Sequence, residues 1–61
     1  MHVYFKKLNG KWYCYGTIAG YDYSFDGLTI DAARIQMIDL LKRKAIDIDS
    51  VKWHEPDLKN V

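Results

Sequence analysis

The amino-acid sequence predicts an α+β domain with the element order β-β-β-α-β: an antiparallel three-stranded meander, one helix packed on one face, and a fourth strand. Three observations carry this prediction. Six of the nine aromatic residues fall between Lys11 and Phe25, in short runs interrupted by glycine, which is typical of strands. Apolar residues then recur at helical spacing from Thr29 to about Lys44, and a short strand-like run precedes Pro56.

The length of the chain, 61 residues and 7.2 kDa, predicts a single domain over residues 1–61. We expect the ordered part to cover about residues 2–55 and a C-terminal tail to cover 56–61. A chain this short buries a small core, and its one cysteine leaves it without an internal disulfide. Self-association or a protein partner is therefore expected to add stability.

The composition narrows the classes of partner. Nine Lys and Arg against eight Asp and Glu give a formal net charge of +1, which produces no strong field toward nucleic acid or anionic lipid. No apolar run approaches the roughly 20 residues of a membrane-spanning helix, so no membrane partner is expected. The lone Cys14 lies in an apolar run, which indicates a reducing compartment and predicts a cytoplasmic location.

A first hairpin is predicted at Asn9-Gly10, which follows a strand from His2 to Leu8. Asn-Gly is a strong hairpin signal because both residues accept the positive φ of a type I′ turn. A two-residue loop places Leu8 opposite Lys11. Counting outward then predicts the pairs Phe5 with Cys14, Val3 with Gly16, Lys7 with Trp12, Tyr4 with Tyr15, and Lys6 with Tyr13.

A second tight turn is predicted at Ala19-Gly20, because glycine supplies the positive φ that one central position requires. A two-residue loop there places Cys14 opposite Phe25 and Gly16 opposite Tyr23. One face, the core face, then collects Val3, Phe5, Trp12, Cys14, Gly16, Ile18, Tyr21, Tyr23 and Phe25. The opposite, open face collects His2, Tyr4, Lys6, Tyr13, Tyr15, Thr17, Asp22, Ser24 and Asp26. A slip of one residue would exchange the faces of the third strand.

Thr29 is the predicted N-cap of the helix, and Asp31 lies in the first turn, where the helix dipole favours an acid. The apolar arc expected to cover the core face is formed by Ile30, Ala33, Met37, Ile38, Leu40, Leu41 and Ala45. Arg34 and Ile35 interrupt this pattern. They are either surface residues, with the Arg34 stem lying along apolar neighbours, or members of a partner interface.

After a loop over residues 46–49, Ser50 to Glu55 is predicted to form the last strand, which Pro56 ends. Val51 and Trp53 would lie on one face of it, and Lys52 and His54 on the other. A strand that is reached through a helix normally runs parallel to the strand the chain left, by a right-handed crossover.

Three stretches occur together in this order: Gly10-Lys11-Trp12-Tyr13-Cys14-Tyr15, then Gly20, then Asp26-Gly27-Leu28-Thr29-Ile30-Asp31-Ala32-Ala33. Over about residues 2–54 they resemble the partner-binding domain of HicB-type antitoxins. Gly16-Thr17-Ile18-Ala19-Gly20 stands where that family has Pro-Asp-Leu-Pro-Gly, and the resemblance is to a stand-alone domain without a DNA-binding segment. It implies a β-β-β-α-β module that binds protein and often self-associates.

We expect no catalytic residue, no cofactor and no metal. The ribonuclease H fold begins with the same element order, but its two-metal chemistry needs a carboxylate on the first strand, and residues 1–8 contain none. The acidic side chains expected on solvated helix and loop surfaces are Asp31, Asp39, Asp47 and Asp49. Cys14 lacks the close sequence spacing to His2 or His54 that is typical of a nucleophile with its base or of a metal site.

The open face is the candidate functional surface, because one helix cannot cover both faces of the sheet. Tyrosine is enriched at protein interfaces, so we expect a small non-enzymatic protein-binding or regulatory module that is homo-oligomeric or binds a protein partner. The candidate contact residues are Tyr4, Lys6, Tyr13, Tyr15, Arg34 and Ile35. The alternative is binding of RNA or single-stranded DNA, since rings beside cations bind single strands. Asp22 and Asp26 on the same face oppose that alternative.

Overall fold

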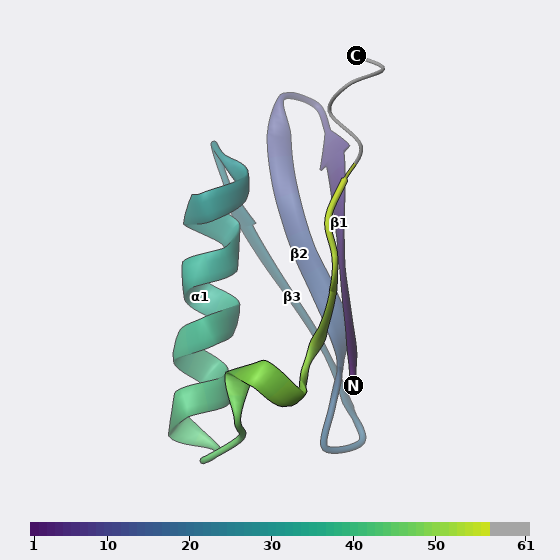
Figure 1. Ribbon diagram of the computed structural model, residues 1–61. Helices are drawn as coiled ribbons and strands as arrows, with labels where there is room; N and C mark the ends of the chain where they lie inside the picture. Colours follow the sequence, from purple (N-terminus) through teal and green to yellow (C-terminus); the bar gives the residue numbers. More distant parts are fainter. Residues whose placement is uncertain (57–61) are drawn as a thin grey trace.

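The computed structural model describes residues 1–56, and its element order confirms the predicted fold class (Figure 1). The strands are β1 (His2–Leu8), β2 (Lys11–Ile18), β3 (Tyr21–Gly27) and β4 (Lys52–His54), and the helices are α1 (Ile30–Arg43) and the 3₁₀ helix η1 (Ile48–Ser50). Apart from Pro56, the predicted tail lies outside the described residues. Between residues 1 and 56, no helix has the length and apolarity needed to cross a membrane.

Both hairpin turns have the predicted position and length. Asn9 and Gly10 have φ angles of 52° and 80°, and Ala19 and Gly20 have φ angles of 52° and 85°. Positive φ at both central residues is the type I′ geometry, whose twist matches that of the flanking strands. The register is confirmed, with the pairs Leu8 and Lys11, Phe5 and Cys14, Tyr4 and Tyr15, Cys14 and Phe25, and Gly16 and Tyr23.

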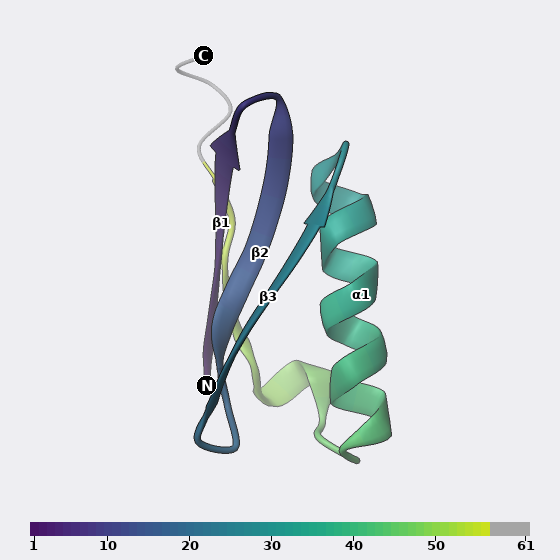
Figure 2. The ribbon, with the colours of Figure 1, turned by 180° about the vertical axis from the view of Figure 1, so that it is seen from behind.

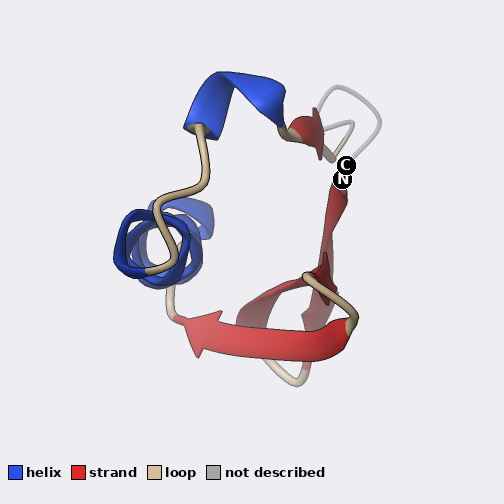
Figure 3. Ribbon diagram, turned by 90° about the horizontal axis from the view of Figure 1, so that it is seen from below, coloured by secondary structure: helices blue, strands red, loops and turns tan. Residues whose placement is uncertain are grey.

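The strands form one mixed sheet in the order β3-β2-β1-β4. β1 and β3 are antiparallel to β2, and β4 is parallel to β1. β4 therefore has the direction of β3, as predicted, although it pairs at the opposite edge of the sheet. In Figure 2, β3 is the edge strand beside α1. Figure 3 shows α1 and η1 on one side of the curved sheet, and no helix or strand of residues 1–56 covers the other side.

α1 begins as predicted, with the Thr29 side-chain oxygen accepting a hydrogen bond from the Ala32 backbone N–H at 3.0 Å. Its end differs slightly from the prediction, because Ala45 has a φ of 56° and lies in a C-terminal turn. There the Ile46 N–H donates to the Leu41 carbonyl at 2.9 Å, which is the Schellman arrangement. Ala45 is exposed, so the prediction that it belongs to the buried arc is wrong.

The core lies between α1 and the core face of the sheet. Its buried members are Val3, Cys14, Ile18, Ala33, Met37, Leu41 and Val51, and the half-buried residues packed on them are Phe5, Tyr23, Phe25, Leu40, Ile46, Ile48 and Trp53. The prediction that Tyr21 belongs to the core is wrong, because this side chain is 67% exposed. Tyr21 is the first residue of an edge strand, beside a turn, so neighbours cover it from few directions.

The last strand is shorter than predicted, because η1 takes up its first residue, Ser50. The Asp47 carboxylate accepts a hydrogen bond from the Asp49 N–H at 3.0 Å and so caps this short helix. The strand proper covers Lys52–His54. Val51 is buried and Trp53 packs on the core, so the predicted alternation of the two faces holds.

Candidate functional site

The candidate site is the open face of the sheet, where alternate side chains point away from α1. Tyr4 on β1 is the cross-strand partner of Tyr15 on β2 and of His54 on β4. Its ring stacks on both, with centroids 5.7 Å from Tyr15 and 4.4 Å from His54. We call Tyr15, Tyr4 and His54 the aromatic row. It crosses three strands, and Tyr4 at its centre is 41% exposed.

A histidine pair adjoins one end of the aromatic row. The His2 Nδ1 atom lies 2.8 Å from the His54 Nε2 atom, a hydrogen-bond distance whose donor depends on the tautomer of each ring. The two imidazole centroids are 5.0 Å apart, and the His2 ring also stacks on Tyr4 at 6.4 Å. Tyr4 therefore contacts both imidazoles and orients them.

Charges on the open face are unevenly distributed. The acids lie on β3, where Asp22 accepts a 2.6 Å hydrogen bond from the Thr17 hydroxyl and Asp26 pairs with Lys11 at 3.7 Å. Apart from Lys11, the cations of this face lie toward the other edge. Lys6 on β1 places its Nζ atom 5.1 Å from the centroid of the Tyr15 ring, and Lys52 is on β4 opposite His2. The face is thus acidic on one side and basic on the other.

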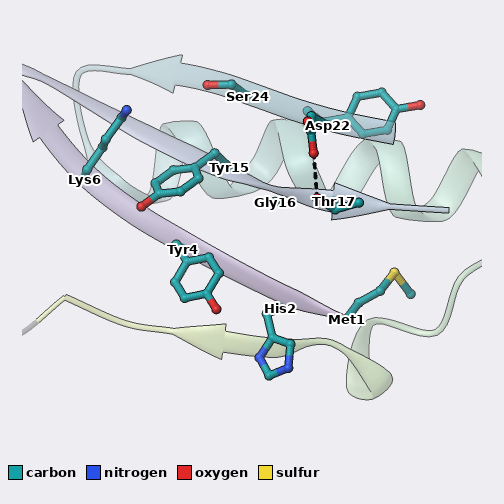
Figure 4. A pocket seen from close by; sticks show the side chains of 10 residues that line it. Met1, His2, Tyr4, Lys6, Tyr15, Gly16, Thr17, Asp22 and Ser24 are labelled. Atoms are coloured by element: carbon teal, nitrogen blue, oxygen red, sulfur yellow. Dashed lines mark hydrogen bonds between the residues drawn. The ribbon is translucent and has the colours of Figure 1, made fainter. Parts of the chain in front are cut away.

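An open hollow of about 690 Å³ lies over the part of this face nearest the start of β1 (Figure 4). Figure 4 shows Tyr4, Tyr15, Lys6 and His2 around it, with α1 behind the sheet. The residues that line it are Met1, His2, Tyr4, Lys6, Tyr15, Gly16, Thr17, Asp22, Tyr23 and Ser24. Rings, one amine and one carboxylate thus border the same space.

The structure brings together four of the six predicted contact residues. Tyr4, Lys6 and Tyr15 are neighbours at the aromatic row, and Tyr13 lies in the next cross-strand row, between Lys6 and Asp26. All of them belong to the open face. The sequence assigned them to this face correctly because both hairpin registers were correct.

Arg34 and Ile35 lie apart from the other four, on α1 and thus on the far side of the sheet. The Arg34 Nη2 atom donates to both carboxylate oxygens of Glu55 at 2.5 and 2.6 Å, and the guanidinium lies 5.2 Å from the Phe5 ring centroid. Asp31 is a second, longer ion-pair partner at 3.7 Å. Arg34 thus connects α1 to the residue after β4. Ile35 is 65% exposed.

Cys14 is buried in the core, as its place in an apolar run predicts. Burial raises the pKa of its thiol from 9.0 to about 11; the Arg34 charge lowers the pKa and the Glu55 charge raises it. Such a thiol stays protonated at neutral pH, and the protonated form is neither a nucleophile nor a metal ligand.

The histidine pair and the third member of the aromatic row are features that sequence reasoning missed. His2 and His54 are 52 positions apart, and no turn fixes how β4 aligns with β1. The available signal was the alternation in the last strand, which placed His54 on the face opposite Val51 and Trp53. It did not say which neighbour His54 would meet.

Comparisons with protein-family models, with curated proteins and with solved structures found no match to this chain.

Proposed function

We propose that the protein is a small non-enzymatic protein-binding module that uses the open face of its sheet, and that its first partner is a second copy of the chain. The observation that carries this proposal is the aromatic row. Tyr15, Tyr4 and His54 are stacked on a face that no other element of residues 1–56 covers. Rings already held by their neighbours lose little side-chain entropy on binding, and tyrosine combines a large apolar area with a polar hydroxyl.

The charge pattern supports a second copy as the partner. A two-fold interface brings the same surface together twice, so it must be self-complementary. Asp22 and Asp26 occupy β3, whereas Lys6 and Lys52 occupy β1 and β4. Rotation about a two-fold axis that runs parallel to the strands through the middle of the face would place the acidic strand of each copy against the basic strands of the other. Opposed charges of this kind fix orientation more than they add affinity.

The size of the face sets the expected strength. β1, β2 and β3 have seven, eight and seven residues and β4 has three, so the face covers on the order of 400 Å², given strand spacings of about 4.8 Å and a rise of about 3.3 Å per residue. A stable interface buries about 800 Å² per partner. We therefore expect weak, reversible association, with a Kd on the order of 0.1–1 mM.

The resemblance to HicB-type antitoxins supports the same proposal, because it implies a domain that binds protein and self-associates. A toxin protein is then a further class of partner, and an antitoxin-like regulatory role belongs to this proposal. So does a cytoplasmic location, since an unpaired buried thiol such as that of Cys14 suits a reducing compartment.

Sedimentation velocity over roughly 10 µM to 1 mM protein tests self-association. The sedimentation coefficient of the wild type is expected to rise with concentration, and that of the Tyr4→Ser/Tyr15→Ser variant to stay at the monomer value. Tyr21→Ser is the matched control, because Tyr21 is an exposed tyrosine outside the open face. A wild type that stays monomeric throughout, or a double variant that associates like the wild type, contradicts the proposal.

Binding to a single-stranded oligonucleotide in place of a second copy would identify the alternative function. Lys6 beside the Tyr15 ring is the observation that favours it. Affinity for nucleic acid falls linearly on a plot of log K against log salt, because counterions are released. An electrophoretic shift that is absent at low salt removes this alternative, and a steep salt dependence without self-association favours it.

A further inference from the structure

Both histidines of this chain lie at one place on the open face. His2 enters from β1 and His54 from β4, and their Nδ1 and Nε2 atoms are 2.8 Å apart. No group of three or more His, Cys, Asp or Glu side chains able to hold a metal ion occurs within residues 1–56. Within these residues an ion held by the pair would thus have two protein ligands, and its remaining positions would belong to water.

The two nitrogens are close enough to occupy neighbouring positions on one metal ion. Imidazole nitrogens bind divalent transition-metal ions at about 2.0–2.1 Å. Two ligand nitrogens are then about 2.9 Å apart if the angle at the metal is 90°, and about 3.3 Å apart if that angle is tetrahedral. The observed 2.8 Å is the length of a hydrogen bond between the two rings, and it brings the two nitrogens within the span of neighbouring positions on one ion. Adjacent positions of an octahedral or tetragonal ion subtend 90°, which is the arrangement that Ni²⁺ and Cu²⁺ prefer.

We propose that His2 and His54 chelate a divalent ion of octahedral or tetragonal preference, of the Ni²⁺ or Cu²⁺ class. The Nδ1 lone pair of His2 and the Nε2 lone pair of His54 each form one bond to the ion, and each displaces one of its water ligands. In the metal-free state one of these nitrogens carries the hydrogen of the 2.8 Å contact. On binding, that proton moves to the other nitrogen of the same ring, and the rings turn so that both lone pairs converge on the ion.

Neighbouring rings hold the pair in place. Tyr4 stacks on His54 at 4.4 Å with an interplanar angle of 14°, and on His2 at 6.4 Å with an angle of 18°. The stacking keeps the two imidazoles side by side, so chelation needs only a turn of each ring and loses less entropy than the capture of two free side chains. Lys52 is the cross-strand partner of His2. Its positive charge would repel a bound cation. Asp22, which accepts from Thr17, is the acid on the facing edge.

Isothermal titration of the untagged protein with NiCl₂ in a non-coordinating buffer tests the site. Ni²⁺ is the primary probe because it does not oxidise the Cys14 thiol. The wild type is expected to bind one ion per chain. His2→Gln and His54→Gln should each weaken binding at least tenfold, since loss of even a supporting contact of a metal ligand costs about 10- to 100-fold. Lys52→Gln is the control and should bind Ni²⁺ at least as tightly as the wild type.

Backbone NMR spectra of the metal-free variants establish that each one folds, and spectra with paramagnetic Ni²⁺ locate the ion. Line broadening confined to the start of β1 and to β4 supports the proposal. Absence of heat and of broadening at millimolar Ni²⁺ overturns it. Binding that is lost in His2→Gln but unchanged in His54→Gln also overturns it, because it assigns the ion to a site without His54. His2→Gln leaves Tyr4, Tyr15 and His54 intact, so loss of Ni²⁺ binding in this variant does not depend on the self-association proposal. His54→Gln also removes one member of the aromatic row, so its effect on Ni²⁺ binding is read against that of His2→Gln.

Discussion

Replacement of Gly16 by alanine is expected to lower the free energy of unfolding, because β1 and β2 approach closely at this position. A Cβ atom on Gly16 would lie 2.6 Å from the backbone oxygen of His2 and 3.4 Å from the Cα atom of Val3. Cβ contacts below 3.0 Å are essentially absent from proteins. Since the blocking atom belongs to the backbone, a side-chain rotation cannot relieve the contact, and the strands must separate locally.

The size of the effect follows from two opposing contributions. Overpacking of this kind costs about 1–3 kcal/mol. Alanine also makes the unfolded chain less flexible than glycine does, which offsets about 0.4–1 kcal/mol of that cost. The net loss for Gly16→Ala is expected to be about 1–2 kcal/mol. For a domain of this size, this corresponds to a fall in Tm of roughly 5–15 °C.

Urea unfolding followed by tryptophan fluorescence measures this loss as a shift of the midpoint at constant slope. Gly20→Asn is the control, because a Cβ at Gly20 meets no atom within 4 Å and asparagine tolerates the positive φ of that position. Its stability should stay within about 0.5 kcal/mol of the wild type. If Gly16→Ala unfolds at the same midpoint as the wild type, the close approach of β1 to β2 is not a constraint on this position.

Two further predictions concern the core and the attachment of β4. The raised pKa of Cys14, about 11 against 9.0, means that the folded state holds the thiol proton more tightly than the unfolded state does. This contribution to the free energy of unfolding is fully present below pH 9, and about 2–3 kcal/mol of it is lost between pH 9 and 11. Cys14→Ala should lack this part of the loss of stability at alkaline pH. An identical loss in both proteins would contradict the assignment to Cys14. A double-mutant cycle with Arg34→Met and Glu55→Gln should give a coupling below about 1 kcal/mol that weakens in high salt, since both side chains are partly exposed; a coupling that salt does not change would indicate a different contact.

The hairpin half of the fold was predictable because each turn has two residues and contains glycine. Once Asn9-Gly10 and Ala19-Gly20 are identified, every pair in β1, β2 and β3 follows by counting, and so does the face of every side chain. The burial of individual residues was less predictable. Tyr21 lies on the core side by parity but is exposed, because parity does not say how far the helix and neighbouring strands extend over the end of an edge strand.

The β4 half of the candidate site was not predictable in the same way. No short turn links β4 to β1, and its partner and register depend on the path of α1 and η1 across the sheet. The alternation in the sequence placed His54 on the face opposite Val51 and Trp53, but the stacking of His54 on Tyr4 and its contact with His2 are tertiary results. The role of Arg34 was open for the same reason, since Glu55 comes into reach only when β4 is in place.

The contacts that hold β4 therefore decide whether the candidate site exists as one unit. β4 pairs with β1 at three positions, and Val51 and Trp53 hold it against the core from the other side. β1 and β2 are joined by six pairs and a tight turn, so Tyr4 and Tyr15 stay together even when β4 detaches. Segments with few contacts open at a lower free energy than the whole domain. Loss of β4 would thus remove His54 from both the aromatic row and the histidine pair, while the tyrosine half of the open face stays intact.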